Sequence, residues 1–203
     1  MLGTMTVVAL ALSAILPPST AGAVPPPPSV SVELVAVNGS GCAAKTASVA
    51  MAKGNSAFTV AYSNFQARAG SGATPTEFRK NCQINVRFKY PAEYTWGISK
   101  VEHHGSAKIL QGANAVLRGS YYFAGSPSTL PMTHTFKGPL NDKWNTTDTA
   151  NPDQIFYPPC GQSWNLNVNT ETRVNKAATT ELSAITMSPD LSATYHLDWR
   201  KCD

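Results

Sequence analysis

The chain has 203 residues, of which 42% are hydrophobic and 14% are charged, with 16 Lys and Arg against 12 Asp and Glu. This apolar fraction is too high for general disorder, and a net charge of +4 is too small and too dispersed to indicate a polyanionic partner. The 15 Pro and 14 Gly, together with abundant Thr, Ser, Val and Asn, exclude a protein of long helices and favour β-structure.

The first 23 residues are predicted to be a signal peptide. They carry no charged side chain, and the apolar run from Met5 to Leu16 is too short to span a bilayer. Ala21-Gly22-Ala23 matches the small-x-small pattern of a signal peptidase site. The absence of Lys and Arg before the apolar run leaves a membrane anchor or a start-codon artefact as the alternative. Cleavage after Ala23 would give a secreted, extracellular protein that is not held in a membrane.

Four consecutive prolines, Pro25 to Pro28, open the mature chain. They favour an extended polyproline II stub over residues 24–29, which we interpret as a spacer. Residues 30–203 contain no internal repeat and no linker, and we expect a single domain there.

Short strand patterns with turn signals between them fill this domain. Lys53–Ser56 is a turn between two strands, and a phase slip near Gly97–Lys100 predicts a β-bulge. The expected strands are 30–37, 46–52, 57–63, 84–90, 94–103, 107–110, 115–123, 132–136, 154–157, 164–174, 183–187 and 195–200. The predicted fold is therefore all-β, an antiparallel β-sandwich of jelly-roll type.

One short helix is expected near residues 75–80. Thr74 is a suitable N-cap, Pro75 follows it at the first helical position, and Glu77 stands three residues after the cap. The helix would end at about Lys80, before Cys82.

The four cysteines fit a secreted protein with two disulfides. None stands in a C-x-x-C pair, which disfavours a zinc or thioredoxin-type site. Of the three pairings, we favour Cys42–Cys82 and Cys160–Cys202, because each closes a local loop of similar length. Free buried thiols are the alternative.

Two sequons predict N-glycosylation at Asn38 and Asn145 in a eukaryotic secretory pathway. Asn38-Gly39 is equally well explained as a turn after a strand.

Five stretches together resemble a known family. They are VELVAVNGSGC (32–42), FRKNC (78–82), THTFKGP (133–139), PCG (159–161) and YHLDWRKC (195–202). This pattern is similar to secreted fungal and actinobacterial proteins grouped as domain of unknown function 4360. The resemblance spans nearly all of the mature chain and includes all four cysteines in order. It implies a secreted, disulfide-bonded β domain and no particular reaction.

Known catalytic motifs are not found in the sequence: it has no G-x-S-x-G, H-E-x-x-H, P-loop or dinucleotide fingerprint. The nearest candidate is Glu102 with His104, which share one face of a strand while His103 takes the other. His134 or His196 could assist them as a metal or acid–base site, but solvated surface histidines are the simpler explanation.

Residues 138–163 are expected to form a long irregular segment. Its oxygen-bearing side chains are of the kind that bind calcium, and they are Asn141, Asp142, Asp148, Asn151 and Asp153. Their spacing matches no EF-hand, and Asn and Asp are also common in turns. Trp144 and Tyr157 flank this segment and could stack on sugar rings, or instead pack the loop onto the sandwich. No other cofactor is expected.

Two functions remain open at this point. The first is a non-catalytic module that binds a glycan, a cell-wall surface or another extracellular partner. The alternative is an extracellular polysaccharide hydrolase or lyase that uses carboxylates or Glu102 and His104. Basic residues never form a run longer than two, so no nucleic-acid partner is expected.

Overall fold

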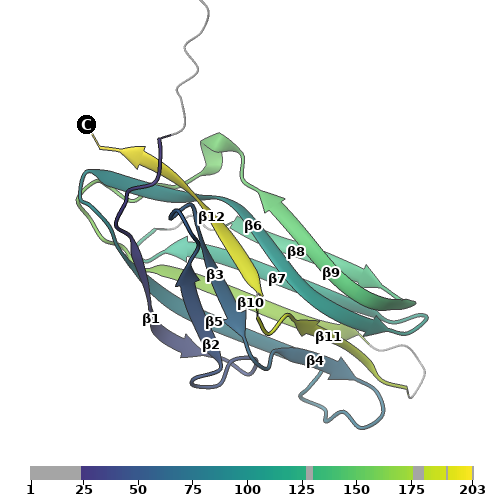
Figure 1. Cartoon of the computed structure of the whole chain (residues 1–203). Coiled ribbons are helices and arrows are strands. Elements are labelled where there is room, and N and C mark those ends of the chain that lie inside the picture. The colour runs from purple at the N-terminus through teal and green to yellow at the C-terminus, as the bar shows by residue number, and fades with distance from the viewer. Residues whose placement is uncertain (1–23, 127–129, 176–180, 191, 203) are drawn as a thin grey trace, which may run out of the picture.

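The computed structural model describes residues 24–126, 130–175, 181–190 and 192–202. The predicted signal peptide lies outside these residues. Two layers of antiparallel strands pack face to face (Figure 1). In chain order the strands are β1 (Ser31–Asn38), β2 (Ala47–Met51), β3 (Ala57–Tyr62), β4 (Gln66–Ala69), β5 (Arg79–Lys89), β6 (Tyr94–Ile109), β7 (Asn114–Phe123), β8 (Leu130–Lys137), β9 (Leu140–Thr149), β10 (Leu166–Asn175), β11 (Ser183–Met187) and β12 (Ala193–Lys201). The predicted all-β antiparallel sandwich is confirmed.

One layer is a five-stranded sheet in the order β1-β5-β10-β7-β8. The other contains seven strands and is organised by β6, which has 16 residues. β12 and then β11 pair with one edge of β6, and β9 pairs with the other edge. Strands β3 and β2 continue the sheet beyond β12, and β4 continues it beyond β11.

A bulge interrupts the pairing of β6 with β12. His196 pairs with Lys100, but the next residue, Leu197, pairs with Ile98, so Ser99 is the extra residue. The bulge falls within the predicted segment. It reverses the alternation along β6, so that both Trp96 and Val101 face the core.

The short helix predicted near residues 75–80 is wrong. The capping contact does form, because the Thr74 backbone N–H donates to Glu77 Oε2 at 2.7 Å. That contact, together with a hydrogen bond from Arg68, lowers the pKa of Glu77 to about 2. The chain completes only a turn before Arg79 enters β5 and pairs with Arg173 of β10. Sheet pairing thus overrides the local preference for a helix.

Two expectations for residues 138–163 are also wrong. Residues 140–149 form the regular strand β9, and the strand predicted at 154–157 is absent, with a 3-10 turn at Pro152–Gln154 leading into irregular chain. The polar composition of β9 hides its alternation, since only Trp144 and Thr146 are buried along it. Its ten-residue pairing with β6 supplies the order that composition does not predict.

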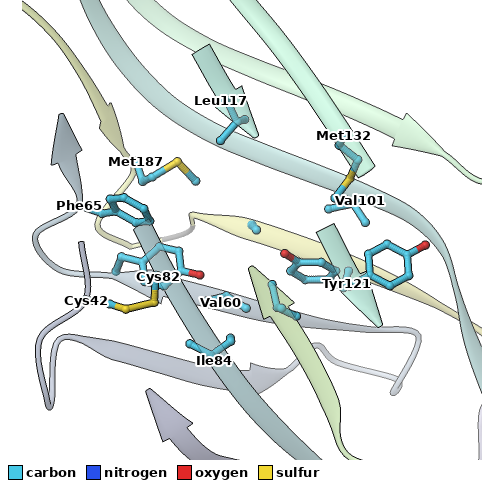
Figure 2. Packing of buried hydrophobic residues seen from close by; sticks show 14 of the residues in the cluster. Cys42, Val60, Phe65, Cys82, Ile84, Val101, Leu117, Tyr121, Met132 and Met187 are labelled. Carbon is cyan, nitrogen blue, oxygen red and sulfur yellow. A yellow bond between two sulfur atoms is a disulfide. The ribbon is translucent and has the colours of Figure 1, made fainter. Parts of the chain in front are cut away.

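The core lies between the two sheets and is rich in aromatic rings. Phe58 stacks on Tyr195 with ring centroids 4.8 Å apart and meets the edge of Phe88 at 5.2 Å. Figure 2 shows the core from Cys42, Cys82 and Phe65 across to Val101, Tyr121 and Met132. Both sheets contribute residues to this cluster. Each sheet therefore buries its apolar face only by packing against the other sheet.

The proline stub contacts the domain. Pro27 is buried, and Asn55 Nδ2 in the β2–β3 turn donates to its carbonyl oxygen at 2.9 Å. The Asn55 carbonyl in turn accepts from the Trp199 indole N–H at 2.9 Å. Residues 24–28 are thereby linked to the strand that ends the domain.

Both predicted disulfides are confirmed, Cys42–Cys82 and Cys160–Cys202. The first joins the segment after β1 to the middle of β5. The second joins the long β9–β10 connection to the residue after β12. The sequence separations are 40 and 42 residues, so the two bridges close loops of nearly equal length.

Replacing Cys160 and Cys202 together by Ala should lower the free energy of unfolding by about 4 kcal/mol, because an unfolded chain without the bridge gains loop entropy. Urea denaturation without reductant measures this loss. The Cys42→Ala/Cys82→Ala variant should lose at least as much free energy of unfolding, because the loop that this disulfide closes is of similar length. In addition, Cys42 and Cys82 are buried, so their replacement removes core packing. A loss below about 1 kcal/mol in either variant would contradict the entropic account.

His103 is a buried titratable group in this core. It is fully shielded from solvent, and neither ring nitrogen has a hydrogen-bond partner among the described residues. Its ring packs over Gly119 of β7, where an added Cβ would lie 3.4 Å from the His103 Cε1 atom. Burial lowers the pKa of His103 to about 4, and the nearby Asp148 opposes this only in part.

His103 should make the protein less stable in acid. The folded state keeps this residue neutral down to about pH 4, whereas an unfolded histidine takes up a proton near pH 6.5. Stability is therefore lost as pH falls from about 6.5 to 4, by about 3 kcal/mol from this residue. In urea titrations across this range, His103→Leu should lose that part of the pH dependence. The control His104→Gln, on the outward face of the same strand, should retain it; equal profiles for His103→Leu and the parent would contradict the prediction.

Candidate functional site

The outward face of the five-stranded sheet carries rows of mostly polar side chains that are in register across four strands. Gln83 of β5, Asn169 of β10, Ser120 of β7 and Pro131 of β8 form one row. The next row consists of Asn81, Glu171, Arg118 and Thr133 on the same strands. The buried residues between them, such as Thr170 and Met132, face the other sheet.

These rows surround a hollow of about 380 Å³, which we call the outer groove. Its lining comes from β5, β10, β7 and β8, and adjacent strands lie about 4.8 Å apart, so the groove crosses about 14 Å of sheet. The lining residues are Arg79, Asn81, Cys82, Gln83, Arg118, Gly119, Ser120, Pro131, Met132, Thr133, Asn169, Thr170 and Glu171.

Several groove side chains have no side-chain partner among the residues that the structure describes. Among the described residues, no side-chain hydrogen bond or ion pair engages five of them: Gln83, Arg118, Ser120, Thr133 and Asn169. They offer amide, hydroxyl and guanidinium groups, which together can donate and accept. These groups are therefore available to a polar ligand.

Glu171 is the carboxylate of the groove, and Arg79 engages it. The Arg79 Nε atom donates to Glu171 Oε2 at 2.7 Å, and this contact raises the pKa of Arg79. Arg118 is the direct neighbour of Glu171 on β7 but makes no ion pair with it. One arginine of the groove is thus neutralised and the other is not.

Beside the groove the amide side chains bond to one another. Asn85 Nδ2 donates to Asn167 Oδ1 at 2.9 Å, and Asn165 Nδ2 donates to Asn85 Oδ1 at 2.8 Å. These hydrogen bonds give Asn85, Asn165 and Asn167 side-chain partners. Asn169, inside the hollow, has no such partner among the described residues.

The sequence signal near this site is the alternation Asn165, Asn167 and Asn169, which leads into β10 and places Asn167 and Asn169 on one face of that strand. Asparagine is depleted in strands, so a regular row of them on one face indicates a cross-strand or ligand-binding role. Sequence reasoning did not use this signal, and it missed Arg118 and Asn169.

The two predicted sugar-stacking residues lie elsewhere. Trp144 points into the core from β9, with 7% of its surface exposed and its ring 5.0 Å from that of Phe136. It therefore has no free ring face for a sugar. Tyr157 is half-buried and donates a hydrogen bond to Asp198, while the Arg200 guanidinium lies 3.6 Å above its ring. One of its faces is already covered.

Glu102 and His104 both lie on the outward face of β6, but Glu102 binds other partners. Its Oε2 is 2.7 Å from His196 Nε2 and its Oε1 is 3.1 Å from Lys100 Nζ. These contacts lower the pKa of Glu102, the His196 hydrogen bond most. His134 lies apart from them and pairs with Asp148 at 2.8 Å.

The calcium candidates do not converge. Asp142 and Asp148 stand six residues apart on the extended strand β9, which separates their backbones by about 20 Å. Asp148 is held by His134, and Asn151 donates to Gln154 at 3.0 Å. Along the described ranges, no cluster of three or more His, Cys, Asp or Glu could hold a metal ion.

The two sequon asparagines, Asn38 at the end of β1 and Asn145 in β9, are both exposed. Within residues 24–202, apart from the undescribed gaps, no helix is long and apolar enough to cross a membrane.

Comparison with known proteins places the chain in a family. The family model for domain of unknown function 4360 matches residues 28–202. The chain belongs to this family. An uncharacterized secreted protein of the fungus Arthroderma benhamiae is 27% identical over 191 residues, which cover 92% of this chain and 78% of that protein. The resemblance seen in the sequence is thereby confirmed.

Among solved structures, a carbohydrate-binding module studied for its specific recognition of mannan is similar over 83% of this chain and 88% of its own. The TM-score is 0.35 and the sequence identity is 7%. A likeness of this extent carries no inference about ligands. The secreted relative and the two disulfides are consistent with an extracellular protein.

Proposed function

We propose that this protein is a secreted, non-catalytic glycan-binding module and that the outer groove holds the glycan. The proposal rests on the amide, hydroxyl and guanidinium side chains that line one hollow and have no side-chain partner in the described part of the chain. Sugar rings present hydroxyl groups that both donate and accept, and such side chains match them. Free glycan or a cell-wall surface would be the partner.

Export supports this proposal. The predicted signal peptide, the disulfides and the secreted relative favour an extracellular location, where polysaccharides are available. The exposed asparagines Asn38 and Asn145 fit glycosylation of the protein itself. Asn145 lies on the other sheet, whereas Asn38 is the direct neighbour of Gln83 across β1 and β5, so a glycan on Asn38 would stand at the edge of the groove.

The geometry gives less support to a hydrolase. Glycoside hydrolysis in most families needs two carboxyl groups placed across the scissile bond. Of the residues that line the groove, Glu171 is the single carboxylate, and it is engaged by Arg79. Glu102 and His104 lie on the other sheet, and the hollow that we describe is lined by other residues.

Asn169→Ala should weaken glycan binding about three- to tenfold, because it removes one ligand hydrogen bond from the centre of the groove. A glycan array and polysaccharide pull-downs would first identify a ligand, and isothermal titration would then measure the affinity. The free energy of unfolding should change by less than about 0.5 kcal/mol, since no described residue makes a side-chain hydrogen bond with the Asn169 side chain.

The matched control is Asn141→Ala on the exposed face of β9, which lies on the opposite sheet and should leave binding unchanged. Two results would contradict the proposal. One is undiminished binding by Asn169→Ala, and the other is release of reducing sugar that depends on a single carboxylate.

A further inference from the structure

We propose that the outer groove selects acidic glycans, namely polysaccharides whose sugars carry carboxylates, over neutral ones. This inference rests on the proposed glycan-binding function and adds the class of ligand. It follows from the charges that the sheet pairing gathers at one end of the groove.

Three arginines and one glutamate lie near one another there in the strand register, and Arg79, Arg118 and Glu171 line the groove. Arg79 and Arg173 are direct neighbours across β5 and β10, and Arg118 is the direct neighbour of Glu171 across β10 and β7. Like charges placed opposite one another on a sheet destabilise it, and Glu171 offsets only one of the three. The local excess is therefore two positive charges.

The carboxylate of Glu171 already forms an ion pair with Arg79. Arg79 directs both its Nε and one terminal nitrogen at the same oxygen, Glu171 Oε2, at 2.7 and 2.5 Å. Arg118 is exposed and has no ion-pair partner among the described residues. Its planar guanidinium can donate two parallel hydrogen bonds to a ligand carboxylate.

Arg173 lies next to the groove, opposite Arg79, and does not line it. Its guanidinium carbon lies 5.5 Å from the centre of the Phe78 ring, and its Nε atom is buried without a hydrogen-bond partner among the described residues. Because this Nε atom is shielded from solvent, a ligand does not reach it, and Arg173 acts only through its charge, which adds to the positive potential at this end of the groove.

The rest of the groove favours a sugar acid over a nucleic acid. Asn81, Gln83 and Asn169 offer amides for hydroxyl groups. The lining contains no aromatic side chain on which a base could stack, which is the usual platform for single-stranded nucleic acid.

The test compares binding to polygalacturonate with binding to the same polymer after methyl esterification, which removes the charge and keeps the backbone. We expect the unmodified protein to bind the acid form more tightly, with an affinity that falls as salt rises. Arg118→Gln should lower the affinity for the acid form at least about tenfold and should leave binding to the ester form nearly unchanged.

Two further variants serve as controls. Lys143→Gln removes the same charge from the exposed face of β9, on the opposite sheet, and should bind both polymers as the parent does. Arg118→Lys keeps the charge without the bidentate geometry and should fall between the parent and Arg118→Gln. Thermal unfolding of each variant confirms that the fold is intact.

The outcomes separate this inference from the proposed function. Equal binding of the acid and ester forms, or binding to neutral glycans alone, would overturn the acid preference while the glycan-binding function stands. Equally tight binding to polyglutamate or to DNA would show a general polyanion site and would also overturn the preference. No binding to any glycan on the array would contradict the proposed function as well.

Discussion

The pairing of β6 along both of its edges is the constraint on which the rest of the structure depends. This strand holds β12 and β11 on one side and β9 on the other, so most of the seven-stranded sheet is attached to it directly or through one neighbour. The bulge at Ser99 turns Val101 and His103 toward the core, where they meet the five-stranded sheet. Because that sheet buries its apolar face against β6 and its partners, its opposite face is left for solvent and ligands.

The register within the five-stranded sheet then decides what this exposed face can do. Side chains that are far apart in the sequence, such as Asn81, Arg118 and Glu171, become immediate neighbours through strand pairing. Composition alone describes a weakly basic chain with dispersed charge. The strand register places three arginines beside one glutamate. A chain with a small overall net charge therefore has a concentrated positive charge at this position.

The errors of sequence interpretation share one physical origin, which is that long-range pairing outweighs local preference. Thr74 and Glu77 do form the capping contact that predicts a helix, yet Arg79 is taken into β5 by its pairing with β10. The polar composition of residues 140–149 predicts a loop. The segment forms a strand because its backbone pairs with the second edge of β6. Trp144 consequently faces the core instead of solvent, and the calcium candidates are spread along an extended chain.

The amino-acid sequence alone predicts the class of fold, most strand positions, the β-bulge, both disulfide pairings and the family, because alternation, turn residues and cysteine spacing are local or nearly local properties. It also contains the clue to the candidate site in the asparagines at 165, 167 and 169. The position of the outer groove, and the lack of side-chain partners in it among the described residues, follow only from the three-dimensional fold. The register between strands sets both, and that register depends on contacts between residues tens of positions apart.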